Sequence, residues 1–286
     1  MKKCLLMGAM SALALNLGSP NVASADESIL GAHRVAMTAS SEIEAFVCSF
    51  NAEGGMITEI VSTALAAVGH ESGPALEFVR DPLTVDLAAT ARSGRIVFPM
   101  YKPRCDEQSL LNVTTAELCH DLNWSDPIFH VVMSGYVASD RDWMPTGNSQ
   151  LIGRTICQPK GQSAFYFTER GLTDLNARIV YASSPMACLK QVEAGESDVA
   201  VLPMIAADPA IKGGALGDSI RHVANLDMIL SVHAIAGGGS PEGAESIEML
   251  NRGLQSIRSN GEWFKIVKEH SGGHSHGERH AAHVSE

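Results

Sequence analysis

The sequence has few aromatic residues and few basic ones, and after its first residues it has no long hydrophobic run. Phe, Trp and Tyr make up 5% of the 286 residues, and 21 Lys and Arg stand against 32 Asp and Glu, a formal net charge of −11. Nucleic-acid binding requires a concentrated basic surface, and the sequence has no basic cluster. The hydrophobic fraction of 45% excludes global disorder. The length fits two ordinary domains or one large one.

The N-terminal apolar run has the features of an export signal. Lys2 and Lys3 precede a mostly apolar run from Cys4 to Leu17, and Ala23-Ser24-Ala25 supplies the small residues that signal peptidase recognises. The run is shorter than the roughly 20 residues of a membrane-spanning helix. We therefore expect residues 1–25 to be a signal peptide cleaved after Ala25 and the mature protein to be periplasmic, an oxidising compartment in which disulfides persist.

Beyond a small, polar lead-in over residues 26–42, runs with strand character alternate with runs of helical periodicity. This alternation is typical of parallel α/β sheets and indicates two α/β lobes. Ser184 is expected to cap a helix that has Pro185 in its first turn and ends at Gly195. The predicted strands cover residues 43–50, 76–79, 96–101, 154–157, 178–181, 198–202 and 228–236. The other predicted helices cover residues 56–68 and 82–92, a helix opened by Ser240-Pro241, and a short amphipathic piece around residues 263–267.

Five short motifs, in order along the chain, resemble bacterial extracellular solute-binding proteins of the polar amino acid type (family 3). The similarity covers residues 42–270. The motifs are Gly55-Met56-Ile57-Thr58-Glu59-Ile60-Val61, Trp124-Ser125-Asp126-Pro127-Ile128-Phe129, the segments 151–161 and 188–201, and the tail 241–268 with Gly261-Glu262-Trp263.

The resemblance implies an α/β fold of the type II periplasmic binding protein class, a two-lobe "Venus flytrap". Each lobe would be a mostly parallel sheet flanked by helices. Residues 40–138 with 229–270 would form lobe 1 and residues 139–228 lobe 2, with crossovers near Val137–Asp140 and Asn225–Leu230. Residues 271–286 would form a disordered, His-rich tail. In this class the lobes close on a ligand by a hinge motion.

The function that the resemblance implies is a periplasmic solute-binding protein, a monomer without cofactor or catalytic activity. It would deliver a small polar or carboxylate-bearing, amino-acid-like solute to the permease of an ABC importer. Two alternatives remain open. One is an accessory or sensory binding protein for an exported enzyme or receptor, and the other is a dehydratase-like enzyme on the same fold. No pair of titratable groups in the sequence is identifiably poised for acid–base catalysis.

The resemblance also suggests ligand-binding residues. Arg104 occupies the place of an Arg that clamps the ligand carboxylate in the first lobe, although a solvated surface Arg is the alternative. Gly161-Gln162-Ser163 matches a second-lobe turn whose amides bind an anion, or is an ordinary tight turn. Glu53 is a candidate to recognise a cation, or lies in a solvated turn. The apolar candidates, Phe50, Tyr101 and Met204, are equally compatible with a place in the core.

Three departures from the family pattern bear on the ligand. Pro203 stands where the family has an Asp for the ligand's ammonium group, and Gly94-Arg95-Ile96 replaces a G-x-x-D motif before the third strand. The Ser and Thr positions that normally precede the clamping Arg are filled by Phe98, Pro99 and Met100. These departures disfavour a zwitterionic amino acid and leave a carboxylate-bearing or other small polar solute. We expect Asp198 to orient its own strand rather than to contact the ligand.

The cysteines suggest two disulfides. Cys105 and Cys119 bracket residues 106–118, which form an insertion relative to the family motifs, and a disulfide there would staple an otherwise floppy segment at the rim of the cleft. Cys157 and Cys188 are the next natural pair. Cys48 would remain a buried thiol.

The C-terminal segment is rich in histidine, interspersed with Gly and Ser. Such a tract is either a hydrophilic tail or a weak site for Zn²⁺, Ni²⁺ or Cu²⁺, and it lacks the spacing of a closed structural site. The candidate ligands are His270, His274, His276, His280 and His283.

Overall fold

The computed structural model describes residues 37–39, 46–47, 54–69, 76–79, 86–107, 111, 113–160, 165–214, 216–239 and 241–272. Within them the chain forms a mixed sheet flanked by helices. The strands are β1 (Met37–Ala39), β2 (Leu76–Phe78), β3 (Ile96–Tyr101), β4 (Leu122–Trp124), β5 (Phe129–Ala138), β6 (Thr155–Pro159), β7 (Arg178–Ala182), β8 (Val199–Pro203) and β9 (Ile220–Gly237). The helices are α1 (Met56–Ala66), α2 (Leu87–Arg92), α3 (Val113–Asp121), α4 (Phe165–Thr168), α5 (Pro185–Glu193), α6 (Met204–Lys212), α7 (Pro241–Ser259) and α8 (Glu262–Gly272).

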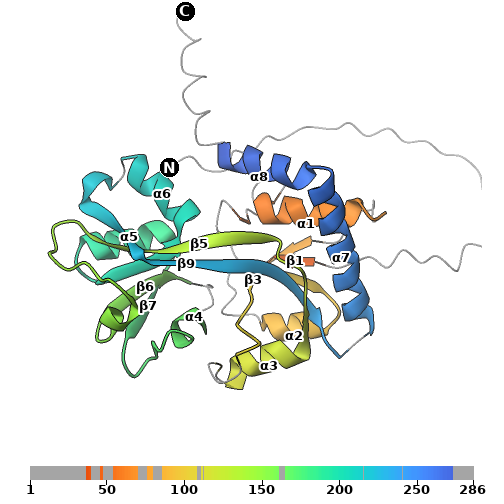
Figure 1. The fold of residues 1–286 in the computed structure, drawn as a ribbon, viewed down its shortest axis with the longest axis horizontal. Helices are drawn as coiled ribbons and strands as arrows, with labels where there is room; N and C mark the ends of the chain where they lie inside the picture. Colours follow the sequence, from red (N-terminus) through yellow and green to blue (C-terminus); the bar gives the residue numbers. More distant parts are fainter. Residues whose placement is uncertain are drawn as a thin grey trace, which may run out of the picture.

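The strands are ordered β2-β1-β3-β9-β5-β8-β6-β7, and β4 pairs with β9. The outer strands are parallel to one another on both sides, whereas β9 and β5 are antiparallel to each other and to their neighbours. Figure 1 shows these two long strands running through both halves of the molecule. We call β1–β3 with α1, α2, α3, α7 and α8 the first half, and β6–β8 with α4, α5 and α6 the second half.

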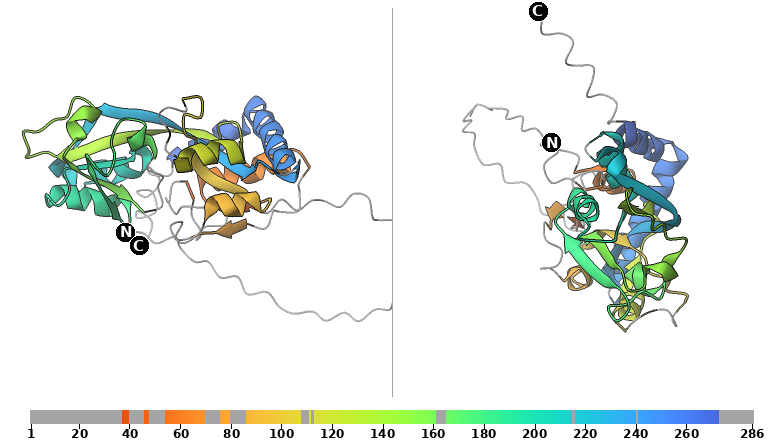
Figure 2. Two further views of the ribbon diagram at one scale, coloured as in Figure 1. Left: turned by 90° about the horizontal axis from the view of Figure 1, so that it is seen from below. Right: turned by 90° about the vertical axis from the view of Figure 1, so that its left-hand side faces the viewer.

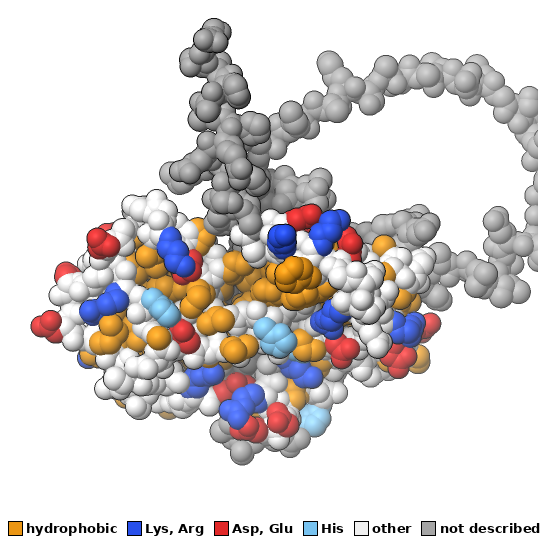
Figure 3. All heavy atoms as spheres, turned by 45° about the horizontal axis from the view of Figure 1, so that its top comes forward, with side chains coloured by type: hydrophobic (Ala, Val, Ile, Leu, Met, Phe, Trp, Pro, Cys, Tyr) orange, Lys and Arg blue, Asp and Glu red, His pale blue; other side chains and the backbone are white. Residues whose placement is uncertain are grey.

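Helices cover both faces of each half (Figures 1 and 2). In the first half α1, α7 and α8 lie on one face and α2 and α3 on the other, and in the second half α5 and α6 lie opposite α4. The apolar side chains of α1 are buried in the core. Because only one side of the helix is buried, these residues recur with the helical period of 3.6, and the sequence predicts the helix from that period. On the face in Figure 3, hydrophobic side chains gather across the middle and charges of both signs surround them. None of the described helices is long and apolar enough to cross a membrane.

Several predicted elements are confirmed. The helix predicted from residue 56 is α1, the strand predicted at residues 96–101 is β3, and those predicted at 154–157, 178–181 and 198–202 are β6, β7 and β8 with small changes of bounds. Helix α5 begins after Ser184, whose hydroxyl accepts a hydrogen bond from the Ala187 amide at 3.1 Å. Gly195, just after α5, has a φ of 76° and ends it.

Three predictions of local structure were wrong. Strand β1 lies within the segment predicted to be a polar lead-in, because its residues pair with both β2 and β3. Of the strand predicted at residues 43–50, the structure describes Phe46 and Val47, which are buried but not in a strand. The Phe46 carbonyl instead accepts a hydrogen bond from the Ile57 amide in the first turn of α1. The insertion that was expected to be floppy apart from its disulfide contains most of helix α3.

Candidate functional site

A pocket of about 630 Å³ lies where segments of both halves meet at β9. It is lined by the segment that follows β3, by two residues that follow α4, and by the middle of β9. Its size is within the usual range for small-molecule sites. The lining residues are Lys102, Pro103, Arg104, Cys105, Asp106, Glu169, Arg170, Ile229, Leu230 and Ser231.

The pocket has more positive than negative charge. Its cations are Lys102, Arg104 and Arg170, and its acids are Asp106 and Glu169. The Arg170 guanidinium donates to the Tyr166 carbonyl at 3.0 Å. Burial lowers the pKa of Arg170, the charge of Glu169 opposes this shift, and the charge of Arg104 adds to it. An anionic ligand would stabilise the charged form of this partly buried guanidinium.

Two acids close to Arg104, Glu169 and Glu107, already have partners. The Glu169 carboxylate accepts a hydrogen bond from the Arg104 backbone amide at 2.9 Å, and the Arg104 guanidinium forms an ion pair with Glu107. The first of these contacts joins the segment after β3 to the segment after α4, so it connects the two halves across the pocket. The guanidinium remains half-exposed at the pocket wall and can exchange its exposed partner for a ligand carboxylate.

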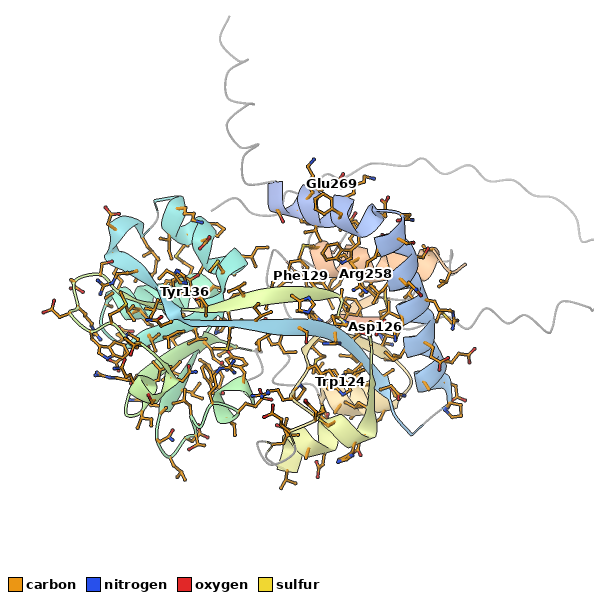
Figure 4. The ribbon with its side chains drawn as sticks, viewed as in Figure 1. Trp124, Asp126, Phe129, Tyr136, Arg258 and Glu269 are labelled. Atoms are coloured by element: carbon orange, nitrogen blue, oxygen red, sulfur yellow. A yellow bond between two sulfur atoms is a disulfide. The ribbon has the colours of Figure 1, made fainter. Side chains whose placement is uncertain are left out.

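Ser231 and His233 form a hydrogen-bonded pair beside the pocket. The His233 side chain is 3% exposed. Its Nε2 lies 2.8 Å from Ser231 Oγ, and its Nδ1 lies 2.7 Å from the Ser125 carbonyl oxygen. Burial, with smaller contributions from the charges of Lys102 and His130, lowers the pKa of His233 to about 4, although the hydrogen bond to the Ser125 carbonyl opposes the shift. Trp124, labelled with Asp126 in Figure 4 in the first half, packs edge-on against the imidazole.

The structure brings some of the predicted ligand residues to this pocket and not others. Arg104 lines it, whereas Tyr101 is packed against the core at the end of β3 and Met204 begins α6, and neither is among the lining residues. Burial raises the pKa of the Tyr101 hydroxyl well above its ordinary value. The other candidates, Phe50, Glu53, Gly161, Gln162 and Ser163, lie outside the described residues.

Asp198 orients its strand, as predicted. It accepts hydrogen bonds from the Thr155 amide at 2.9 Å and from the Arg141 guanidinium at 3.0 Å. The bond from Thr155 ties the beginning of β8 to the beginning of β6.

Lys102, Glu169, Arg170 and Ser231 line the pocket but were not predicted from the sequence. One available signal was the alternation of Ser231 and His233 within the apolar run Met228-Ile229-Leu230-Ser231-Val232-His233-Ala234. Two polar side chains two residues apart share one face of a strand, which indicates that this face is not wholly apolar.

Both predicted disulfides are present. Cys105 and Cys119 join the pocket rim to α3 with a Cα–Cα distance of 5.6 Å, and Cys157 and Cys188 join β6 to α5 with a distance of 5.5 Å. Cys105 lines the pocket, so its disulfide supports the wall that carries Arg104. Cys48 lies outside the described residues.

His270 belongs to α8 and not to a loose metal-binding tract. Its Nε2 lies 2.7 Å from the Glu59 carboxylate of α1, so this side chain joins two helices. No group of three or more His, Cys, Asp and Glu within the described part of the chain is arranged to hold a metal ion. The other predicted metal ligands, His274, His276, His280 and His283, lie outside it.

No family model and no curated protein matches the sequence, but solved structures match the fold. An ancestral arginine-binding protein bound to arginine matches with a TM-score of 0.61 at 14% identity, over 82% of this chain and 96% of that one. The chain has the type II periplasmic binding protein fold. A histidine kinase sensor domain similar to periplasmic binding proteins matches with a TM-score of 0.61 at 17% identity, over 83% and 95% of the two chains.

A third structure with this binding-protein fold is an ancestral amino acid-binding protein, a precursor of cyclohexadienyl dehydratase. It matches with a TM-score of 0.58 at 15% identity, over 82% of this chain and 93% of that one. The type II periplasmic binding protein fold confirms the fold class predicted from the five motifs. Because the identities are this low, the similarity establishes the fold alone, and function must be argued from the pocket.

Proposed function

We propose that this protein is an exported binding protein that holds a small carboxylate-bearing solute in the pocket between its two halves. The observation that carries the proposal is the lining of the pocket, where Lys102, Arg104 and Arg170 outnumber two acids, one of which already accepts a hydrogen bond across the pocket. In the proposed complex the Arg104 guanidinium binds the solute carboxylate, and Lys102 and Arg170 contribute a favourable electrostatic potential.

The type II fold supports a hinge mechanism for this function. We propose that residues 40–138 with 229–270 and residues 139–228 act as the two lobes, with β5 and β9 as the connecting strands. The hydrogen bond from the Arg104 amide to Glu169 then belongs to the closed form, in which segments from both lobes meet. The proposal includes removal of residues 1–25 on export to the periplasm and delivery of the solute by the monomer to an ABC permease.

A second candidate is a binding protein that reports to a receptor or an exported enzyme rather than to an importer. Two observations favour it: the similarity to a histidine kinase sensor domain, and helix α3, which is tied by a disulfide to the pocket rim and is available as a contact surface. Neighbouring genes distinguish the two roles, because permease and ATPase genes indicate an importer, whereas a kinase or an exported-enzyme gene indicates the accessory role.

Native mass spectrometry of freshly purified protein, followed by calorimetric titration with organic acids and amino acids, tests the binding function. Arg104→Ala should weaken binding of a carboxylate by roughly 10- to 100-fold, the usual effect of losing a charge-assisted hydrogen bond. Arg104→Lys should bind with intermediate affinity, because it keeps the charge but not the two-pronged geometry. Arg252→Ala, an exposed change on α7, is the matched control. Equal affinities of Arg104→Ala and Arg252→Ala would contradict the proposal.

A further inference from the structure

Ser231 is the polar group that β9 presents to the pocket. Residues two apart on a strand share a face, and Ile229, Ser231 and His233 therefore lie on one face of β9. Ile229 and Ser231 line the pocket, and the buried His233 lies directly behind Ser231. The pair therefore joins the pocket to the interior of the first half.

The hydrogen bonds of His233 determine where the proton of the Ser231 hydroxyl lies. The Ser125 carbonyl oxygen can only accept, so the Nδ1 atom 2.7 Å away must carry the imidazole proton. In a neutral imidazole the other nitrogen is then an acceptor. Since Nε2 lies 2.8 Å from Ser231 Oγ, the Ser231 hydroxyl donates its only proton to His233. Toward the pocket, Ser231 Oγ can therefore act only as a hydrogen-bond acceptor, through its two lone pairs.

We infer that Ser231 is a specificity-determining residue, held as a hydrogen-bond acceptor by His233, and that the bound solute carries a hydroxyl or amino donor near its carboxylate. This inference rests on the proposed function. The wall beside Ser231 complements it, because Lys102 and Arg104 are donors that suit a carboxylate and cannot accept a hydrogen bond from the solute. Lys102 and Arg104 would bind different carboxylates equally well. The Ser231 acceptor would then favour those carboxylates that carry a hydrogen-bond donor.

The same geometry does not make Ser231 a nucleophile. A serine is activated by a base that can take its proton near the working pH. The pKa of His233 is about 4, which makes its imidazole too weak a base to take the proton of a serine hydroxyl at neutral pH. His233 is accordingly a positioning residue that acts through Ser231.

Burial is the main reason that His233 is neutral at the pH of binding, and the charged groups around it modify this effect. Lys102 after β3 and His130 on β5 disfavour the imidazolium, and Asp126 between β4 and β5 favours it more weakly. Asp126, which follows β4, is labelled in Figure 4. Protonation of His233 below about pH 4 would turn Nε2 into a donor and release the Ser231 proton toward the pocket. Selectivity for a donor should therefore be constant from pH 8 to about pH 5 and should fall below it.

Three dicarboxylates that differ in one group test the inference by calorimetry: glutarate, 2-hydroxyglutarate and glutamate. Wild-type protein should bind 2-hydroxyglutarate, glutamate or both roughly tenfold more tightly than glutarate, as expected for one hydrogen bond. Ser231→Ala should reduce this ratio to about one by the same reasoning, Ser231→Thr should keep it, and Ser259→Ala on α7 is the matched control. Equal binding of all three by the wild type, or an unchanged ratio in Ser231→Ala, would overturn the role of Ser231 and leave carboxylate binding intact.

Binding of none of the three probes would contradict the proposed function and the recognition role together. Nitrogen-15 NMR of histidine-labelled protein supplies an independent measurement. It should show the imidazole of His233 protonated at Nδ1 alone down to about pH 5, and the selectivity ratio should fall in step with its titration near pH 4. A proton on Nε2 at neutral pH would overturn the inference whatever the affinities.

Discussion

On one side of the central strands β9 and β5 the sheet continues as β3, β1, β2, and on the other side as β8, β6, β7. Each side is a set of three parallel strands attached to an antiparallel pair, so the two halves correspond strand for strand. The residue just before the inner parallel strand is Arg95 in the first half and Asp198 in the second. A pair of corresponding positions therefore carries side chains of opposite charge.

The two side chains perform the same task. Arg95 Nε donates to Thr38 Oγ1, and its terminal nitrogen donates to the Met37 carbonyl, both at 2.8 Å, which ties the start of β3 to β1. Asp198 accepts from the Thr155 amide and so ties the start of β8 to β6. The comparison shows that each half has a charged side chain at this position, of opposite sign, that joins two neighbouring strands. Arg95, which departs from the family motif, therefore has a structural role.

The halves also differ in how a helix is attached to its sheet. In the second half a buried disulfide between Cys157 and Cys188 joins β6 to α5. Replacing both cysteines with alanine should lower the free energy of unfolding by about 2–5 kcal/mol, with little effect on the pocket. Urea unfolding measures the loss of stability, and calorimetric titration with the ligand measures any change in affinity.

The partly exposed disulfide between Cys105 and Cys119 is the matched comparison. It closes a shorter loop, with a sequence separation of 14 against 31, so its loss should destabilise the protein less. Because Cys105 lines the pocket, that loss should weaken ligand binding more. The reverse pattern of effects would contradict this division of roles.

The histidines of β9 differ between the halves as well. His222, on the side of the second half, lies 2.7 Å from Asp227, whereas His233 in the first half is buried and neutral, with its pKa lowered to about 4. The unfolded chain binds a proton at His233 near pH 6.5 and the folded one only near pH 4, so stability should fall as the pH drops through this window. The full loss is about 3 kcal/mol.

Urea titrations at pH 7.5 and pH 4.5 test this expectation. The difference in stability between the two pH values should be smaller in His233→Gln than in the wild type, because glutamine has no charge to acquire. His222→Gln is the control and should leave the contribution of His233 in place. A wild-type pH dependence that persists unchanged in His233→Gln would contradict the assignment.

Helix α7 of the first half approaches α1 through a glycine rather than through a disulfide. A Cβ atom at Gly253 would lie 2.0 Å from the Ala64 carbonyl oxygen, so a larger residue would force the helices apart. Gly253→Ala should lower the melting temperature and cost about 1–3 kcal/mol of stability, as overpacking usually does. Gly239→Ala, where no atom lies within 4 Å of the new Cβ, is the control. Equal stability of the two variants would show that α7 can shift at little cost.

Much of the second half could be predicted from the sequence because its signals are local. Ser184, Pro185 and Gly195 determine the bounds of α5 without help from the rest of the chain. By contrast, β1 has only three residues and becomes a strand by pairing on both sides. Helix α3 has no strong apolar stripe, and its position depends on the disulfide and on tertiary packing.

Of the residues that line the pocket, only one that belongs to a family motif could be predicted from the sequence. Arg104 was found through its place after the third strand, but Glu169 and Ser231 reach the pocket from segments far apart in the sequence. The role of Ser231 depends further on the Ser125 carbonyl, which lies 108 residues from His233 and orients its imidazole. Only tertiary structure brings these groups together.

The smallest effects on stability should come from replacing Arg95 and Asp198, the charged residues that precede β3 and β8. Arg95→Met keeps the stem of the side chain but leaves Thr38 and the Met37 carbonyl without their donor, and it should cost about 1 kcal/mol. Asp198→Asn keeps an acceptor for the Thr155 amide but leaves the Arg141 guanidinium without its charged partner. It should cost about 1–2 kcal/mol and more than Arg95→Met, because the lost partner is ionic.

Chemical denaturation at low and high salt separates these contributions. Salt should narrow the difference between wild type and Asp198→Asn, since an ion pair is screened. It should narrow the difference for Arg95→Met less, since Arg95 has two neutral oxygen partners besides its ion pair with Glu77. Ligand affinity should be unchanged in both variants, because neither residue lines the pocket. A change of affinity in Arg95→Met would instead show that the charge before β3 affects ligand binding. Arg95 and Asp198 would then not have equivalent roles in the two halves.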